Sequence, residues 1–153
     1  MNLAELNNLL NSELTSKIKE SKEENGELLI NVELSSIYST ILFLKTNNKC
    51  KFKQLIDILA VDFPGEEDRF KIYYLLLSHE NNLRIKLACP IQIDAKVPSI
   101  TQIYPSANWM EREVFDMYGI KFKNHPDLRR ILTDYNFKGF PLRKDFPLTG
   151  FNE

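Results

Sequence analysis

The sequence predicts an α+β domain of two layers, in which a mixed sheet packs against flanking helices and an extended C-terminal tail follows. Three observations point to this class. The 153 residues are enough for one domain. Apolar side chains alternate along the chain between the period of a helix and that of a strand. The last stretch follows neither period. We therefore expect the α+β domain over residues 1–120 and the tail over residues 121–153.

The first two elements are expected before residue 35. Apolar residues recur at intervals of three and four near the N-terminus, which predicts a helix within residues 1–25 that Asn25-Gly26 ends. The residues of this stripe are Leu3, Leu6, Leu10, Leu14 and Ile18. Leucine, isoleucine and valine then alternate with polar residues over 28–34, which predicts a strand with one buried face.

The remaining elements complete the order helix, strand, helix, three strands, helix. Ser35 and Ser36 are good N-cap residues for a second helix, which carries Ile37, Ile41 and Leu44 on one face. Strands are expected over 52–61, 69–78 and 83–91, and the last two form a hairpin across 80–82. Residues 106–118 predict a third helix, ended by Gly119.

Composition excludes several classes of function. The formal net charge of −1 provides no overall attraction to nucleic acid or to an anionic membrane. The longest apolar run, 72–77, is far shorter than the roughly 20 residues that span a bilayer. Residues 1–25 hold five glutamates and no arginine, so we expect no targeting segment there. Cys50 and Cys89 stand far apart without a C-x-x-C motif, so no iron–sulfur or zinc ligand set is expected.

The densest charge cluster is Glu111-Arg112-Glu113 with Asp116 on the third predicted helix. Residues three and four apart on a helix are neighbours, so these side chains can meet on one side. A metal or acid–base site is one interpretation, with His125 as its nearest further ligand. The favoured interpretation is an ion-pair helix that faces solvent or a protein interface.

The predicted tail is basic and aromatic. It carries seven basic residues against four acidic ones and five of the ten phenylalanines of the chain. Arginine and aromatic residues are enriched in protein interfaces, and basic residues among aromatics also bind single-stranded nucleic acid. Asp127, Asp134 and Asp145 interrupt the basic residues, which weakens a track for phosphates. A protein surface is therefore the preferred partner.

Three sequence blocks resemble a known family. They are Glu111-Arg112-Glu113-Val114-Phe115-Asp116-Met117-Tyr118-Gly119-Ile120, then His125-Pro126-Asp127-Leu128-Arg129-Arg130-Ile131-Leu132-Thr133-Asp134-Tyr135, and Pro141-Leu142-Arg143-Lys144-Asp145-Phe146-Pro147-Leu148. Together they closely resemble the signature of the C subunit of proton-pumping NADH:quinone oxidoreductase, the 30-kDa subunit family of respiratory complex I. Upstream matches include Val61-Asp62-Phe63-Pro64 and Arg69-Phe70. Asn136 and Phe140 depart from the glycine and histidine that the family usually has there.

The resemblance implies a structural and assembly subunit without catalytic residues of its own. It implies a place in the quinone-reducing module of the peripheral arm, where the complex couples electron transfer from NADH to quinone to proton translocation. The implied partners are the D, B and I subunits, and FMN and the iron–sulfur clusters are expected in partner subunits rather than in this chain. The implied location is peripheral, on the matrix side of the mitochondrial inner membrane or the cytoplasmic side of a bacterial one. The block from Ile131 to Tyr135 resembles mitochondrial and alphaproteobacterial members of the family. Abundant Lys, Asn and Ile indicate an AT-rich genome, which together with the expected lack of a targeting segment favours a gene kept in the organelle.

We therefore predict a partner interface and neither a catalytic site, a cofactor site nor a metal site. Its residues are Glu111, Arg112, Glu113, Asp116, His125, Asp127, Arg129, Arg130, Asp134, Tyr135, Arg143, Lys144, Asp145 and Phe146. Two other hypotheses stay open. One is a free-standing α+β module that binds nucleic acid through the basic aromatic tail. The other is a small enzyme that uses Glu113, Asp116 and His125.

Overall fold

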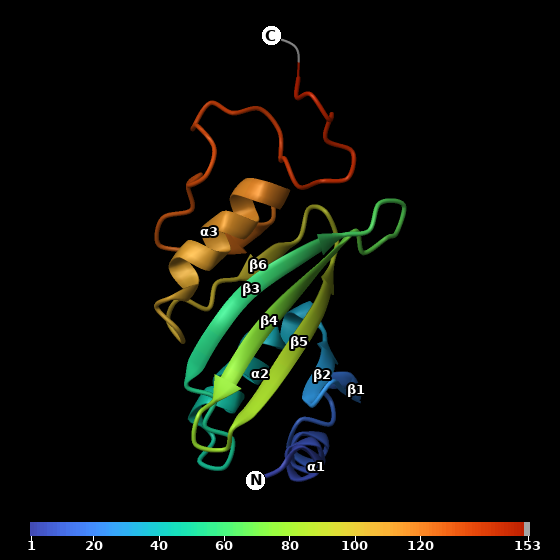
Figure 1. Cartoon of the computed structure of the whole chain (residues 1–153), viewed down its shortest axis with the longest axis vertical. Coiled ribbons are helices and arrows are strands. Elements are labelled where there is room, and N and C mark those ends of the chain that lie inside the picture. Colours follow the sequence, from blue (N-terminus) through green and yellow to red (C-terminus); the bar gives the residue numbers. More distant parts are fainter. Residues whose placement is uncertain (152–153) are drawn as a thin grey trace.

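A computed structural model describes residues 1–151 as an α+β fold, as the sequence predicts (Figure 1). A five-stranded mixed sheet has the strand order β1-β2-β5-β4-β3, and β6 and β7 form a separate pair. The helices are α1 (Leu3–Glu13), α2 (Leu34–Thr46) and α3 (Ala107–Tyr118). The strands are β1 (Ile18–Glu24), β2 (Glu27–Val32), β3 (Gln54–Asp62), β4 (Phe70–Ser78), β5 (Leu83–Ile91), β6 (Lys96–Pro98) and β7 (Lys121–Lys123).

The core lies between one face of the large sheet and the three helices, and α3 contributes Ala107 and Val114 to it. Figure 1 shows α2 behind this sheet. Alternate residues of β4, from Phe70 to Ser78, are buried on this face, as the period of two predicts. Strands β4 and β5 form the predicted hairpin, in which Ser78 pairs with Leu83. Strand β2 joins β5 in parallel, and the other neighbouring pairs are antiparallel. The alternation is confirmed in β2, β4 and β5 but not in the outermost strand beside β2.

That outermost strand, β1, corrects the prediction of one helix within residues 1–25. Helix α1 ends at Glu13, and Ile18–Glu24 pairs with β2 as an antiparallel edge strand. Asn25 and Gly26 do not end a helix; their positive φ angles of 53° and 77° form the tight turn of this hairpin. Strand β1 is highly charged because an edge strand is exposed to water. It therefore lacks the apolar alternation that identifies a buried strand.

The boundaries of the other elements are close to the predicted ones. Helix α2 begins at Leu34 after Glu33, which makes no side-chain cap bond, so the predicted capping by Ser35 or Ser36 is wrong. Helix α3 ends as predicted, with Gly119 in the left-handed conformation at φ 76°. The short strands β6 and β7 were not predicted. They pair in parallel although their paired residues, such as Lys96 and Lys121, stand 25 positions apart in the sequence. Local sequence patterns do not report on a pairing at that separation.

The last part of the chain lies across one end of the domain, beyond α3 (Figure 1). Ile120 and Phe122 are still buried, whereas no residue from 123 to 151 is. We name residues 124–151 the C-terminal segment. The predicted division of the chain at residue 120 stays a prediction. The last two positions of the predicted tail, 152 and 153, lie outside the described residues.

Candidate partner-docking site

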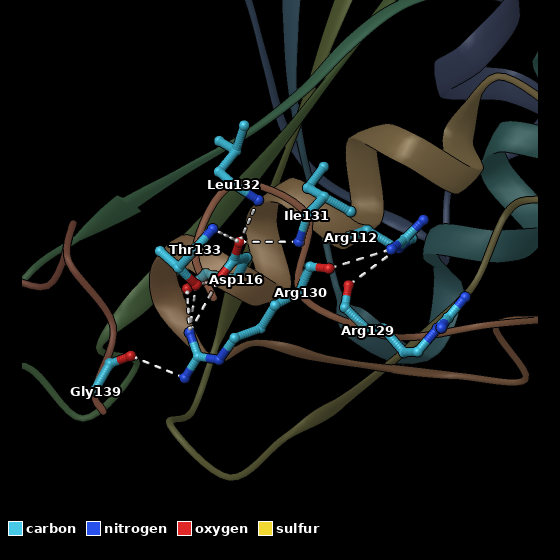
Figure 2. A network of polar contacts seen from close by, with 8 residues as sticks. All are labelled: Arg112, Asp116, Arg129, Arg130, Ile131, Leu132, Thr133 and Gly139. Atoms are coloured by element: carbon cyan, nitrogen blue, oxygen red, sulfur yellow. Dashed lines mark hydrogen bonds and ion pairs between the residues drawn. The ribbon is translucent and has the colours of Figure 1, made fainter. Parts of the chain in front are cut away.

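Asp116 of α3 attaches the C-terminal segment to the domain. Figure 2 shows its carboxylate facing the loop of residues 130–133. Oδ2 accepts hydrogen bonds from the backbone N–H groups of Ile131, Leu132 and Thr133 at 3.1, 2.7 and 3.0 Å. Oδ1 accepts from the Thr133 hydroxyl and from the Arg130 guanidinium, the latter at 2.9 Å. One buried side chain thus determines the path of a segment that has no regular secondary structure of its own.

The ionised form of Asp116 is the one that this geometry stabilises. Burial by itself raises the pKa of the carboxyl, but the hydrogen bonds from Thr133, Leu132 and Arg130 outweigh it and lower the pKa to about 2. The carboxylate is fully buried, and Arg130 supplies the opposite charge. Asp116 therefore remains charged at neutral pH although it lies inside the protein.

Two arginines complete this attachment in ways that the sequence does not reveal. Arg130 also donates to the carbonyl of Gly139 at 3.0 Å (Figure 2). Its guanidinium lies over the ring of Phe140. Arg112 donates to the carbonyls of Arg129 and Arg130 at 3.0 and 3.2 Å. The expected meeting of Arg112 with Asp116 on the helix surface is therefore wrong, because both side chains are buried against the C-terminal segment.

A second attachment lies at the ends of β3 and β4. Arg69 binds the Asp62 carboxylate with two hydrogen bonds of 2.8 and 3.0 Å, and Asp62 also accepts from the backbone N–H of Lys144. The bonds to Arg69 lower the pKa of Asp62. Asp145 pairs with Arg69 at 3.1 Å. Arg143 donates to the carbonyl of Tyr118 at 2.7 Å, which joins the segment to the end of α3.

Glu111 and His125 form a buried polar contact under the N-terminal half of α3. The Glu111 carboxylate accepts from the backbone N–H of Ile100 and the hydroxyl of Ser99, both at 2.7 Å. Burial raises the pKa of Glu111 to about 7. His125 Nε2 lies 3.0 Å from the carbonyl of Asn108 and 3.9 Å from the Glu111 carboxylate. Its Nδ1 accepts from the N–H of Asp127, so the neutral ring with the proton on Nε2 fits both bonds.

The residues of the enzyme hypothesis are not brought together. Glu113 is exposed, Asp116 is held by the loop of residues 130–133, and the nearest carboxylate to His125 is that of Glu111. Within residues 1–151, no cluster of three or more His, Cys, Asp or Glu side chains has the arrangement of a metal site. Both cysteines are buried, which raises the pKa of Cys50 to about 11 and that of Cys89 to about 12.

The C-terminal segment is attached to the domain through polar groups, and it also exposes several large apolar side chains. Leu132 and Tyr135 are 64% and 70% exposed, and Trp109 of α3 is 64% exposed. Other large apolar side chains of the segment are also exposed, namely Phe137, Leu142, Leu148 and Phe151. Isolated apolar side chains on a surface are normal, whereas several on one short segment indicate a protein-binding surface.

The predicted interface residues fall into three groups by position. The side chains of Glu111, Arg112, Asp116 and His125 are buried within the chain, so the first three do not face solvent. Asp127, Arg130, Arg143 and Phe146 are half-buried. The exposed ones are Glu113, Arg129, Asp134, Tyr135, Lys144 and Asp145. Their assignment to an interface with another protein stays a prediction.

Sequence reasoning missed several residues of the site. Asp62 and Arg69 hold the far end of the C-terminal segment, although both stand in blocks that resemble the family, which is the signal that identifies them. Trp109, Leu132 and Leu148 are exposed apolar residues that no charge pattern marks.

Within residues 1–151, no helix has the length and apolar character needed to cross a membrane.

A family model and several curated proteins match most of this chain. The family model of the respiratory-chain NADH dehydrogenase 30 Kd subunit matches residues 30–152. The NADH-quinone oxidoreductase C subunit of Ruegeria pomeroyi is 55% identical over 128 residues, which cover 84% of this chain and 64% of the relative. The proteins of the same name from Roseobacter denitrificans and from the Wolbachia of Brugia malayi are 49% and 50% identical. Those matches cover 99% and 86% of this chain and 76% and 70% of the relatives.

A solved structure is also similar. It is a chain in the structure of the membrane-bound sulfane sulfur reductase, described as an archaeal respiratory membrane complex, with a TM-score of 0.78 and 26% identity. The match covers 95% of this chain and 85% of that one. The chain spans about three fifths to three quarters of the length of the curated relatives that it matches, and less than two thirds of the one from Ruegeria pomeroyi.

Proposed function

Since the chain belongs to the family of the respiratory-chain NADH dehydrogenase 30 Kd subunit, we propose that it is a structural and assembly subunit of a complex I. In this role it contributes rigid surface to the quinone-reducing module of the peripheral arm and supports electron transfer from NADH to quinone, coupled to proton translocation. Three relatives with 48–55% identity are named as the C subunit of NADH-quinone oxidoreductase.

The observation that carries this proposal is the construction of the C-terminal segment. Its backbone is held by internal bonds to Asp116 and Asp62, while Leu132 and Tyr135 face outward. Ordering a backbone costs about 1–2 kcal/mol per residue, and most side chains of the segment are half-buried or exposed and offset little of this cost. A pre-ordered apolar surface binds a partner with a smaller loss of entropy on association. The arrangement is therefore suited to docking and not to chemistry.

The partners that the proposal names are the D, B and I subunits of the complex. FMN and the iron–sulfur clusters belong to neighbouring subunits in this proposal, since the two cysteines stand 39 residues apart and are both buried. The chain reaches the membrane only through the complex, on the cytoplasmic side in a bacterium or on the matrix side in a mitochondrion. The relatives described above are bacterial.

The nucleic-acid hypothesis is the weaker one for a geometric reason. Arg112 and Arg130 donate to backbone carbonyls or to Asp116, and Arg143 donates to Tyr118. Arg129 is paired with Asp127 at 2.6 Å. Guanidinium groups that are already used within the chain have to exchange these partners before they bind phosphates.

Assembly on native gels tests the proposal directly. The double variant Leu132→Ala and Tyr135→Ala removes apolar side chains that are exposed and therefore contribute little to the stability of the isolated chain. We expect much weaker incorporation into the complex and a nearly unchanged thermal midpoint. Leu42→Ala on α2 is the control, because this leucine is also exposed. Normal incorporation of the double variant would contradict the proposed docking role.

A further inference from the structure

A groove between β3 and α3 lies beside the C-terminal segment, and the proposed docking surface at Leu132 and Tyr135 does not include it. Its apolar lining includes Leu59 of β3, Met117 of α3 and Leu142 of the segment. The groove holds about 130 Å³, which corresponds to about four molecules of liquid water. Pockets for small molecules and cofactors hold roughly 300–1,000 Å³, so the groove suits a protein side chain and not a cofactor.

Two apolar side chains that line the groove are exposed. Leu59 is 42% exposed and Leu142 is 51% exposed. Leu59 lies on β3, the edge strand at the other end of the sheet from β1, on the sheet face opposite the core. Figure 1 shows no helix across this face. Leu142 donates its backbone N–H to the carbonyl of Met117 at 3.1 Å. The groove is therefore continuous with the C-terminal segment that the proposed function assigns to docking.

Each wall of the groove carries one carboxylate, Asp57 from β3 and Glu113 from α3. In the described part of the chain, neither carboxylate has a cationic partner. Asp57 accepts only the backbone N–H of Ile58, at 2.8 Å. Asp62 and Asp116, by contrast, are paired with arginines. A partner that covers the groove buries two negative charges, which is favourable only if it brings positive charge.

We propose that the β3–α3 groove receives a segment of another subunit in which an apolar side chain neighbours a lysine or arginine. The apolar side chain occupies the space between Leu59, Met117 and Leu142, and the cation lies between Asp57 and Glu113. This inference rests on the proposed function, since it names a second contact of the same assembled chain. It specifies the chemistry of that partner segment.

Photo-cross-linking in the assembled complex tests the occupant. A benzophenone amino acid is placed in the full-length chain at position 59, and at position 42 in a control, because Leu42 is as exposed as Leu59 but lies on α2. We expect position 59 to capture one defined peptide of another subunit, with a lysine or arginine within a few residues of the attachment. Capture of a second copy of this chain, or of a peptide without a basic residue, would overturn the inference.

A third position separates this inference from the proposed function. The same amino acid at position 132 probes the exposed surface of the C-terminal segment. If position 132 captures another subunit and position 59 captures none, the groove inference fails and the docking role stands. If neither position captures a subunit, the proposed function fails as well.

Charge reversal tests the carboxylates. In competition with the unmodified chain for incorporation into the complex, Glu113→Lys should be incorporated about tenfold less, with Glu113→Gln in between. The thermal midpoint of the isolated variant should stay within a few degrees, because Glu113 is exposed. Asp94→Lys, at an exposed acid outside the groove, is the matched control. Equal incorporation of Glu113→Lys and the unmodified chain would show that no cation lies there.

Discussion

Replacing Asp116 by asparagine removes the charge that holds residues 131–133 against α3. The side chain keeps its size, but only one of its two polar atoms can then accept hydrogen bonds. It therefore cannot serve both the three N–H groups that donate to Oδ2 and the Thr133 hydroxyl and Arg130 guanidinium that donate to Oδ1. The guanidinium of Arg130 also loses its counter-ion. We therefore expect the C-terminal segment to detach locally while the sheet stays folded.

The size of this effect follows from the pKa of Asp116. The hydrogen bonds of the folded chain lower it from 3.8 to about 2, which corresponds to a stabilisation of the charged form by about 2.5 kcal/mol. If detachment is the opening that exposes these amides, the same free energy makes the opening roughly 50- to 100-fold more frequent. The contribution is present above pH 3.8 and is lost as the pH falls towards 2, because a lowered pKa stabilises the ionised state.

Amide hydrogen exchange measures this opening residue by residue. At neutral pH, the amides of residues 131–133 should exchange roughly 50- to 100-fold faster in Asp116→Asn than in the unmodified chain. The amides of β4 and β5 serve as an internal reference, since they open only with the core. Asp134→Asn is the matched variant, because it makes the same chemical change at an exposed carboxylate of the same segment.

Two results would refute the reasoning. One is unchanged protection of residues 131–133 in Asp116→Asn, which would mean that the carboxylate does not hold them. The other is an equal loss of protection in β4 and β5, which would mean that the segment and the sheet unfold as one unit. In the unmodified chain, protection corrected for the intrinsic exchange rate should also fall between pH 4 and 2, and the variant should lack this fall.

Three further predictions concern other contacts. Burial raises the pKa of Glu111 from 4.5 to about 7, so its neutral form stabilises the fold, and this contribution is lost as the pH rises through 7. Between pH 4.5 and 7, the free energy of unfolding of Glu111→Gln should therefore rise by about 3 kcal/mol relative to that of the unmodified chain. Denaturant titrations that give the same difference between the two chains at every pH would refute this. Gly119→Ala places a Cβ 2.6 Å from the ring of Phe140 at a residue with φ 76°. It should lower the thermal midpoint more than Gly65→Ala, because position 65 also has a positive φ but its Cβ would have no atom within 4 Å. Equal midpoints of the two variants would contradict the steric argument. Asp145→Ala loses only an exposed contact with Arg69, so native gels should show weaker assembly with little change in melting, and a large drop in the midpoint with normal assembly would contradict this.

Local patterns were sufficient for the elements that bury one face. The hairpin of β4 and β5 follows from the alternation over residues 69–91, because burial of alternate side chains is itself the cause of the pattern. The end of α3 follows from Gly119, because only glycine adopts the left-handed conformation there at little cost. The blocks from residues 111 to 148 were also sufficient to identify the family.

Local patterns failed where a contact joins distant residues. Leu14 and Ile18 stand four apart as in a helix, but the pairing of β1 with β2 overrides that spacing. The charge cluster on α3 pointed to the right helix and to the wrong partners. Arg112 and Asp116 stand four apart, yet each binds the backbone of residues 129–133 instead of the other.

The sequence by itself thus determined the fold class, most of the strands and the family, since these depend on residues close together in the chain. The tertiary structure alone decided which charges are buried and which apolar side chains stay exposed. The physical reason is that a buried carboxylate needs several donors at once, and α3 cannot supply them from its own hydrogen-bonded backbone. The donors to Asp116 lie in a loop about fifteen residues further along the chain. Because this contact holds the C-terminal segment in one conformation, the exposed apolar side chains of the segment form an ordered surface.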